Sequence, residues 1–353
     1  MYRNTYVEVD LRNLKHNVKT LVERYKDYTY YFGVVKADCY GHNGNGCVRA
    51  VLDGGCNYLA VATLEEALTI REEIADVPVL CFGIIKERDL PLCLEKNVTV
   101  TIPSLSWIRS LSAPPKGLKA HVKVNSGMNR LGVARREDFN EACALARKLG
   151  FTLEGVYTHI YEASDRDNTL RQYAAFEEIT ADADLGSFRI VHVGASEATE
   201  NFPKRPYANG CRLGIAMYGL IDYENVDFRP TFRLYSEVIQ LNEVDEGVVG
   251  YNGTHKVQGH ERIAVVPLGY ADGFIRKNKG RNVYIHGKAF PIVGNVCMDM
   301  FFVQVDDTVQ VGDKVAVIRD IEHIKEIAKH LDTITYEVTC SIGKRVPRVY
   351  IKE

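Results

Sequence analysis

The sequence of 353 residues lacks an apolar run of the roughly 18 residues that a membrane span needs, so we do not expect an integral membrane protein. Its first residues, MYRNTYVEVD, lack the apolar core of a signal peptide, and we expect a cytoplasmic protein with no membrane partner. Neither sign of charge predominates, since 44 lysines and arginines face 46 aspartates and glutamates. This balance gives no general attraction to nucleic acid, and we expect no nucleic-acid partner.

None of the nine cysteines forms a C-x-x-C pair with another, and their number is odd. The pattern indicates neither a disulfide framework nor a zinc ribbon, and we predict no metal site. Buried, small apolar thiols in a reducing compartment are the interpretation that fits. The composition, 46% apolar and 25% charged, is that of a globular protein.

Short β-branched runs alternate with amphipathic stretches over the first two thirds of the chain. The runs are YYFGVV ending near Lys36, YLAVAT from Tyr58, VPVLCFGI from Val77, VTVTI from Val98, LKAHVKV from Leu118, LEGVYTHI from Leu153, FRIVHV from Phe188 and LGIAMYG from Leu213. Near-continuous apolar runs are typical of strands that are buried on both faces, as in a parallel sheet.

Helical faces occur between these runs. One extends from Leu11 to Tyr25 with Asp10 as its N-cap, and another from Phe139 to Leu149 with Gly150 as its stop. Eight strand-then-helix units within about 220 residues predict an α/β fold of the (β/α)8 type, a TIM-type barrel. An open doubly wound sheet is the alternative, but eight strands favour closure.

After about Asp227 the pattern changes to short strands punctuated by Gly, Asp and Asn, with one clear helix from Ile321 to His330. We therefore predict a barrel over residues 1–227 and a C-terminal all-β domain over residues 228–353. Residues 1–10 are the part of the first segment that could instead pack with the second domain.

Polar residues stand where the barrel strands are expected to end, and this is where such barrels carry their function. They are Lys36, Lys123, Arg130, His159, His192 and Ser196, whereas Arg212, followed by Gly214 and Ile215, opens the eighth run.

Among these residues, Lys36 is the strongest candidate for a chemically reactive group. An apolar strand that delivers a lysine into a cup is costly unless the amine is paired or chemically used. One use is a Schiff base with a carbonyl cofactor, which removes the charge. A lone lysine at a strand end more often simply reaches solvent, so this residue alone does not decide between the two interpretations.

Seven motifs in order, VVKADCYGH, KVNSGMNRLG, RLGIAMYG, GYNGTH, VPLGYADG, VGNVCMDM and SIGKRVPR, together resemble those of the alanine racemases over nearly the whole chain. The resemblance implies a barrel followed by a β domain, the cofactor pyridoxal 5′-phosphate (PLP), and interconversion of L- and D-alanine, an isomerase reaction that supplies a D-amino acid for cell-wall precursors.

The resemblance also implies roles for the residues that match. Lys36 matches the lysine that holds PLP and serves as one catalytic base, and Arg212 matches the arginine that faces the pyridine nitrogen. The residues that match phosphate contacts are Tyr40, Ser196, Gly214 and Ile215. His159 and His192 match residues around the cofactor ring and its arginine.

Tyr251 in GYNGTH matches the second catalytic base, while Tyr270 and Met298 match residues at the substrate entrance and carboxylate site. In the family Tyr251 and Met298 come from a partner subunit, which implies a head-to-tail homodimer. Arg130 matches an arginine near the substrate carboxylate. Lys123 matches a lysine that is carbamylated in some relatives.

The chain departs from the family pattern before R-V-P-R, where Lys344 replaces a common tyrosine. Ala195 likewise stands where H-x-x-N-S has asparagine, and D-T-G-M-G-R reads N-S-G-M-N-R here. Without that tyrosine ring the pocket loses bulk that helps to restrict it to a methyl group, and Lys344 could meet a polar substrate. Alanine stays the leading substrate, followed by serine or a broader polar set, then an acidic or basic amino acid.

Two other functions remain open from the residues. A non-catalytic PLP-binding protein would share the barrel and its lysine, but it would need neither Tyr251 nor the C-terminal domain. A barrel decarboxylase for basic amino acids would place a glutamate where this chain has Arg212.

Overall fold

Eight parallel strands close into a barrel in the computed structural model, which describes residues 2–352. The strands are β2 (Tyr30–Val34), β3 (Tyr58–Val61), β4 (Val79–Cys81), β5 (Val98–Ile102), β6 (Lys119–Lys123), β7 (Thr152–Tyr157), β8 (Ile190–Ala195) and β9 (Gly210–Leu213). Most of their residues are buried on both faces, as the apolar runs predicted. The predicted TIM-type barrel is thereby confirmed.

Helices connect the strands and cover the barrel. They are α1 (Leu11–Arg24), α3 (Gly44–Asp53), α4 (Leu64–Arg71), α5 (Leu90–Glu95), α6 (Leu105–Ser110), α7 (Arg136–Lys148), α8 (Arg166–Ile179) and α9 (Ser196–Asn201), with short 3₁₀ turns η1 (Glu87–Asp89) and η2 (Leu185–Ser187). The N-cap prediction for α1 is confirmed, because Asp10 accepts hydrogen bonds from the backbone N–H groups of Arg12 and Asn13.

The predicted position of the eighth strand was wrong. It is β9, which ends at Leu213, whereas LGIAMYG from Leu213 leaves the sheet and folds as the 3₁₀ turn η3 (Ile215–Tyr218). Gly219 closes that turn with a φ of 66°, which glycine adopts without steric cost. Arg212 consequently lies at the end of a strand and not at the start of one.

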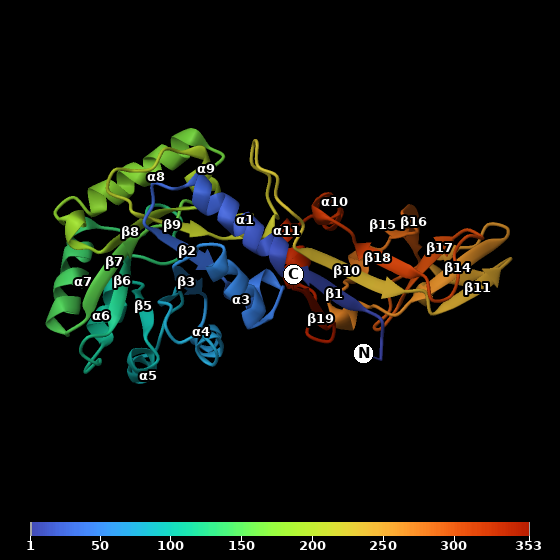
Figure 1. Cartoon of the computed structure of the whole chain (residues 1–353), viewed down its shortest axis with the longest axis horizontal. Coiled ribbons are helices and arrows are strands. Elements are labelled where there is room, and N and C mark those ends of the chain that lie inside the picture. Colours follow the sequence, from blue (N-terminus) through green and yellow to red (C-terminus); the bar gives the residue numbers. More distant parts are fainter. Residues whose placement is uncertain (1, 353) are drawn as a thin grey trace.

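The C-terminal region is rich in strands and lies beside the barrel, which gives the molecule its elongated shape (Figure 1). A nine-stranded sheet comprises β1 (Tyr6–Asp10), β10 (Phe232–Glu237), β11 (Gln240–Val244), β14 (Glu261–Val266), β15 (Asn282–Ile285), β16 (Lys288–Val293), β17 (Phe301–Val305), β18 (Lys314–Ile318) and β19 (Arg348–Ile351). A separate hairpin is formed by β12 (Val248–Val249) and β13 (His255–Lys256).

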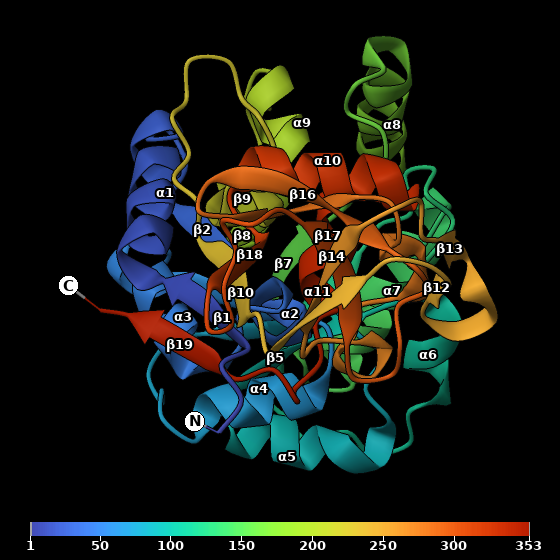
Figure 2. The same ribbon diagram turned by 90° about the vertical axis from the view of Figure 1, so that its right-hand side faces the viewer.

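Strand β1 belongs to this distant sheet although it precedes the barrel. It pairs antiparallel with β10 and parallel with β19, so the first and last strands of the chain lie side by side. Figure 2 shows β1 and β19 together at one edge of the sheet, next to β10.

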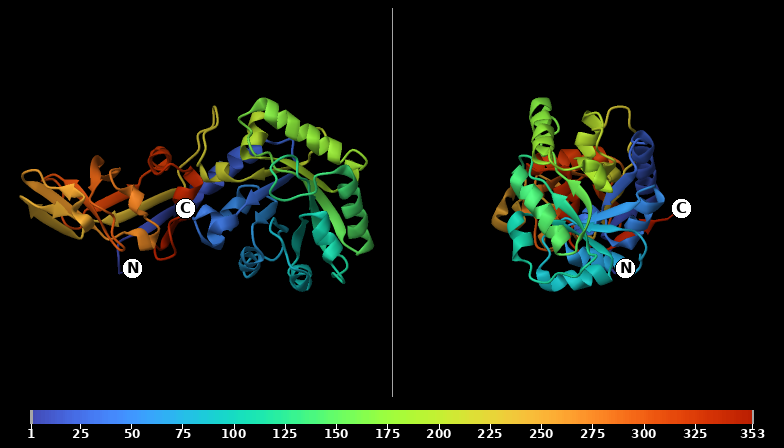
Figure 3. Two further views of the ribbon diagram at one scale, coloured as in Figure 1. Left: turned by 180° about the vertical axis from the view of Figure 1, so that it is seen from behind. Right: turned by 90° about the vertical axis from the view of Figure 1, so that its left-hand side faces the viewer.

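Two helices accompany the sheet. The predicted helix is α10 (Ile321–Leu331), and a second one, α11 (Thr335–Cys340), was not predicted. Helix α11 contacts both α10 and the segment α2 (Lys36–Tyr40) that follows the first barrel strand. It therefore stands where barrel and sheet meet, as the views in Figures 1 and 3 show. No helix within residues 2–352 is long and apolar enough to cross a membrane.

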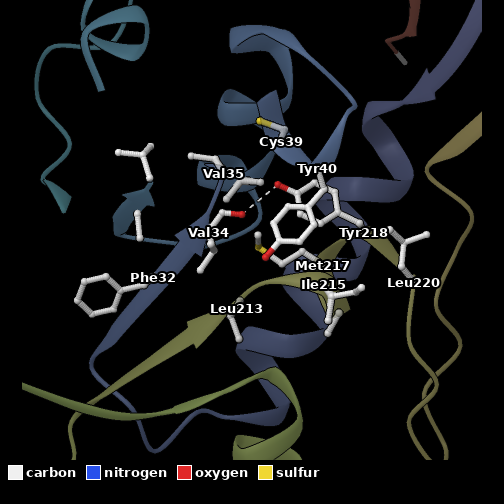
Figure 4. Packing of buried hydrophobic residues seen from close by; sticks show 14 of the residues in the cluster. Phe32, Val34, Val35, Cys39, Tyr40, Leu213, Ile215, Met217, Tyr218 and Leu220 are labelled. Atoms are coloured by element: carbon white, nitrogen blue, oxygen red, sulfur yellow. Dashed lines mark hydrogen bonds between the residues drawn. The ribbon is translucent and has the colours of Figure 1, made fainter. Parts of the chain in front are cut away.

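Packing inside the barrel supports the end of β2. The ring of Phe32 stacks on Tyr58 and on His192, each at 4.4 Å between centroids. At the strand end, the hydroxyl of Tyr218 donates a 3.2 Å hydrogen bond to the carbonyl of Val34 (Figure 4). These contacts fix the backbone just before Lys36.

One buried carboxylate joins three parts of the C-terminal region. The fully buried Asp272 accepts two 2.9 Å hydrogen bonds from Arg3 and one of 3.1 Å from the backbone N–H of Gly269. Arg345 approaches the same carboxylate at 3.4 Å. The group thus connects the N-terminal segment, the loop after β14 and the C-terminal R-V-P-R motif.

We predict that Asp272→Asn lowers the free energy of unfolding by about 3 kcal/mol. The substitution removes the buried negative charge and leaves the guanidinium groups of Arg3 and Arg345 without their carboxylate. Denaturant unfolding measures this. Asp138→Asn, which breaks the exposed pair with Arg135, is the control and should change little. Equal effects of the two substitutions would contradict the proposed importance of Asp272.

Candidate active site

A cavity of about 680 Å³ opens at the carboxyl ends of the barrel strands. Most of the residues predicted for the site line it, and these are Lys36, Tyr40, Lys123, Arg130, His159, Ser196, Arg212, Gly214 and Ile215. The residues come from five strand ends that are far apart in sequence. The barrel thus brings together the groups that its strand ends were expected to present.

The segment that follows Lys36 has an unusual backbone. Ala37, Asp38, Cys39 and Tyr40 have φ values of 52°, 50°, 56° and 56°, so they form a left-handed turn that ends at Gly41. Left-handed helical conformation costs roughly 1–2 kcal/mol for each residue that has a Cβ. Such strain persists only where the surroundings impose it.

Glu66 at the start of α4 is one of the groups that holds this turn. Its Oε1 accepts a 2.6 Å hydrogen bond from the N–H of Ala37, and its Oε2 accepts one of 2.8 Å from Ala62. The same carboxylate completes a capping box with Thr63. Glu66 thereby ties the residue after Lys36 to the end of the neighbouring strand.

The cavity has an excess of positive charge. Burial, and then the nearby Arg130, lower the pKa of Lys36, and Glu66 opposes this shift only in part. Burial together with Arg212 and Arg130 lowers the pKa of Lys123 to about 7. For His159, burial and the surrounding cations lower the pKa to about 3. An anionic ligand would relieve this mutual repulsion.

Arg212 is buried at the floor of the cavity without a carboxylate partner among residues 2–352. Its Nη1 donates to the carbonyl of His192 at 2.7 Å and its Nη2 to that of Thr158 at 2.8 Å. No acceptor within the described chain meets its Nε, although the residue lines the cavity. Since a guanidinium has only donors, this N–H fits an acceptor atom of a bound group.

A chain of hydrogen bonds extends from Arg212 through the barrel core. Nη1 of Arg212 lies 3.0 Å from Nδ1 of His192, whose Nε2 lies 2.9 Å from Nδ1 of His121. Nε2 of His121 lies 3.3 Å from Oε2 of Glu154, which also accepts a 2.8 Å hydrogen bond from Tyr58. His192 therefore lies behind the cavity wall and touches the cavity only through Arg212.

The groups at the two ends of this series of hydrogen bonds, Arg212 and Glu154, determine which histidine nitrogens carry a proton. Because Arg212 only donates and a carboxylate only accepts, each histidine accepts at Nδ1 and donates at Nε2. Burial lowers the pKa of both His192 and His121, which keeps the two rings neutral. Burial alone would raise the pKa of Glu154, but hydrogen bonds from His121 and Tyr58 hold it below its ordinary value.

Backbone and hydroxyl groups converge at another corner of the cavity. The N–H of Gly214 donates to Oγ of Ser196 at 3.1 Å. A Cβ built on Gly214 would lie 3.2 Å from the hydroxyl oxygen of Tyr40 and 3.7 Å from Oγ of Ser196. The missing side chain thus leaves the space between two hydroxyls open, which is the geometry of a small anion cradle.

Three predicted residues lie outside the barrel cavity, on the C-terminal region. Tyr251 begins the turn η4 (Tyr251–Gly253) and is 68% exposed, and with Tyr270 it borders a separate hollow. Tyr270 begins the turn η5 (Tyr270–Asp272), and the next residue, Ala271, donates its N–H to the carbonyl of Met298 at 3.0 Å. Tyr251 and Tyr270 thus share a hollow, Met298 lies beside the η5 turn, and none of the three lines the cavity that holds Lys36.

Lys344 also does not line the cavity. Its side chain is 85% exposed, and its Nζ lies 3.4 Å from a carboxylate oxygen of Asp38 in the left-handed turn. It therefore borders the segment after Lys36 from outside.

Several groups of the site were missed by the sequence reasoning. Helix α11 contributes Tyr336 and Cys340 to the cavity wall, and Glu66 and His121 act one layer behind it. The T-x-x-E spacing of Thr63 and Glu66 is a capping signature that could have indicated Glu66. No local pattern pairs His121 with His192.

We predict that His121 and His192 carry their single proton on Nε2 at pH 7 and above, which ¹⁵N spectra of histidine-labelled protein measure. Their pKa values lie below the ordinary 6.5, so the folded state binds fewer protons than the unfolded state. Stability is therefore complete above pH 6.5 and falls as the pH drops below it. An Nδ1–H tautomer at His192 would contradict the assigned direction of donation, which runs from Arg212 through the two histidines to Glu154.

The chain matches two family models in succession. The alanine racemase N-terminal domain matches residues 9–222, and the alanine racemase C-terminal domain matches residues 231–350.

Curated relatives and solved structures agree with these models. The chain is 35% identical to alanine racemase 1 of Bacillus subtilis, over 99% of this chain and 94% of the relative. It resembles the crystal structure of alanine racemase from Bacillus anthracis with bound L-Ala-P with a TM-score of 0.94 and 33% identity, over 100% and 96% of the two chains. For the enzyme from E. faecalis the TM-score is 0.93 with 32% identity, over 99% of each chain. The chain belongs to the alanine racemase family.

Proposed function

We propose that this protein is a PLP-dependent racemase that interconverts L- and D-alanine. The observation that carries the proposal is the placement of Lys36 and the donor-only Arg212 in one cationic cavity at the barrel mouth. Membership of the alanine racemase family supports the same reaction.

The residues present fit PLP as the cofactor. Lys36 would hold its aldehyde carbon, the free Nε–H of Arg212 suits an unprotonated pyridine nitrogen, and the Gly214 corner suits a phosphate. Ser196, Tyr40 and the N–H of Ile215 would bind that phosphate. When bound, PLP supplies the acidity at the substrate Cα that makes proton removal feasible.

Two bases on opposite faces account for racemisation. Lys36 would hold or return the proton on the D face of Cα, since its lowered pKa favours the free amine. Tyr251 would serve the L face. His159, at the cavity wall, and His192, behind it, would orient the floor of the site without exchanging a proton, because burial and the surrounding cations lower the pKa of both.

We propose a homodimer in which each site is completed by the other subunit. Tyr251, Met298 and Tyr270 are exposed and adjacent on the C-terminal region, and none lines the barrel cavity of its own chain. A head-to-tail arrangement would place them over the partner's barrel mouth, with Tyr270 and Met298 at the substrate entrance and carboxylate site.

Arg130 and Lys123 form the substrate-carboxylate part of the proposal. Arg130 is exposed at the cavity, where its charge can pair with the substrate carboxylate. Lys123, with a pKa of about 7, has a substantial neutral fraction that can attack carbon dioxide, forming an N–C bond and releasing one proton. The resulting carbamate would carry a negative charge to orient Arg130.

Two further expectations stay predictions. These are the division of the chain into residues 1–227 and 228–353, and the cytoplasmic location.

The proposal predicts that purified protein with PLP converts L-alanine to D-alanine, as read by chiral chromatography. Lys36→Ala should abolish both this conversion and the borohydride-fixed adduct at position 36. Tyr251→Phe should keep the adduct and lose about 10²–10⁴-fold in racemisation, the typical contribution of one acid–base group.

Mixing the two variants tests the shared site. A mixed dimer of Lys36→Ala and Tyr251→Phe chains contains one site with both native bases, so activity should return on mixing. The racemase proposal fails if the protein with PLP stays colourless and borohydride fixes no adduct. The shared-site proposal alone fails if both single variants behave as expected and mixing restores nothing.

Lys344 gives a prediction on specificity. Lys344→Tyr restores a ring beside the turn after Lys36, and we expect the ratio of kcat/KM for alanine over serine to rise about tenfold, within the ~1–3 kcal/mol that apolar bulk supplies. Lys344→Met removes the charge without adding a ring and serves as the matched control. An unchanged or reversed ratio in Lys344→Tyr would refute a role for this position in specificity.

A further inference from the structure

A second cavity, of about 220 Å³, lies in the C-terminal region on the other side of α11 from the barrel cavity. Its walls are largely apolar and include Leu234, Phe274, Ile318, Ile327, Val338 and Ile342. These residues come from the sheet, from α10 and α11, from the loop after η5 and from the segment after α11; Figure 1 shows the sheet and the two helices side by side. The cavity shares only Glu337 with the candidate active site.

Arg281 is the charged group inside this apolar cavity. The residue is 7% exposed, and its Nε donates to the side-chain oxygen of Asn278 at 2.7 Å. Its Nη1 donates to the carbonyls of Asn282 and Val317 at 2.9 and 3.1 Å. Across the residues that the structure describes, nothing accepts from Nη2, so two N–H donors of a buried guanidinium have no acceptor.

The charge of Arg281 is also not balanced by an acid. It forms no ion pair with any carboxylate between residues 2 and 352, and the guanidinium lies over the ring of Phe274, 5.0 Å from its centroid. Burial lowers its pKa to about 9, with no acidic neighbour acting against this. Burial and then Arg281 itself lower the pKa of His323 to about 4, so the histidine adds no charge at neutral pH.

Two carboxylates border the cavity at its exposed rim. Glu337 accepts a hydrogen bond from the hydroxyl of Thr333, and Asp332 is exposed. Neither pairs with Arg281. The cavity therefore has a buried cationic end, apolar walls and an open polar rim.

We propose that this cavity is a binding site for a small monocarboxylate with a compact apolar body. The carboxylate would accept the free Nη2–H groups of Arg281, and the body would fill the apolar walls. A cavity of about 150 Å³ is known to hold benzene, so this larger one has room for a benzene-sized body and a carboxylate. Such a ligand would press on the face of α11 opposite to Tyr336 and Cys340.

Benzoate is the probe, and benzamide, which has the same shape without the charge, is the control ligand. Calorimetric titration of the PLP-loaded protein should show saturable binding of benzoate and none of benzamide. Arg281→Met should weaken benzoate binding about tenfold or more, because a charge-assisted hydrogen bond is lost. Val338→Phe, which fills the cavity and leaves Arg281 intact, should do the same.

Arg130→Met separates this site from the active site, whose own cations can also attract a carboxylate. The proposal predicts that benzoate binding persists in Arg130→Met. It is overturned if benzoate does not bind saturably, if binding is lost in Arg130→Met, or if it survives Val338→Phe. The last variant decides the matter if Arg281→Met fails to fold, and none of these outcomes depends on racemase activity.

Discussion

A buried guanidinium, that of Arg212, with no carboxylate beside it among residues 2–352 is the constraint around which the barrel mouth is built. Arg212 stays in place because the carbonyl of Thr158, just after β7, and that of His192, within β8, accept its N–H groups. Every atom that forms a hydrogen bond with this guanidinium must accept it. The same direction of donation therefore continues from His192 to His121 and from His121 to Glu154. The proton positions at the floor of the site are thus set by geometry across the whole barrel.

The rest of the mouth follows from an unbalanced positive charge. Burial and the charge of Arg130 lower the pKa of Lys36 and of Lys123, and Glu66 offsets this only in part at Lys36. Such a cavity gains stability when an anion enters. A phosphate-bearing cofactor and an amino-acid carboxylate are both of that kind, which explains why one set of residues suits both.

Much of the fold could be predicted from the sequence because its strands are apolar on both faces. The same criterion misplaced the eighth strand, since the apolar run from Leu213 is too short to tell a strand from a 3₁₀ turn. Helix α11 escaped prediction because its six residues, TYEVTC, include three β-branched ones that favour strands. Its stability comes from contacts with α2 and α10.

The residues of the candidate site likewise fall into those that the sequence could predict and those that it could not. Lys36 could be predicted because it follows a strand end, whereas the motif RLGIAMYG, and not its place on a strand, indicated Arg212. His121 and Glu154 could not, because their partners lie on other strands and no spacing along the chain encodes the contact. The exposed position of Lys344 also depends on the tertiary fold, since only there does it meet Asp38.

The placement of β1 has a consequence for how the chain is made. Its buried residues Val7 and Val9 lie opposite Leu234 and Phe232 of β10 on one side, and opposite Arg348 and Tyr350 of β19 on the other. A ribosome therefore releases all eight barrel strands before the first segment has both of its neighbours. Strand β1 therefore obtains its second neighbour only when β19 has been synthesised, so the pairing of Val7 and Val9 stays incomplete until then.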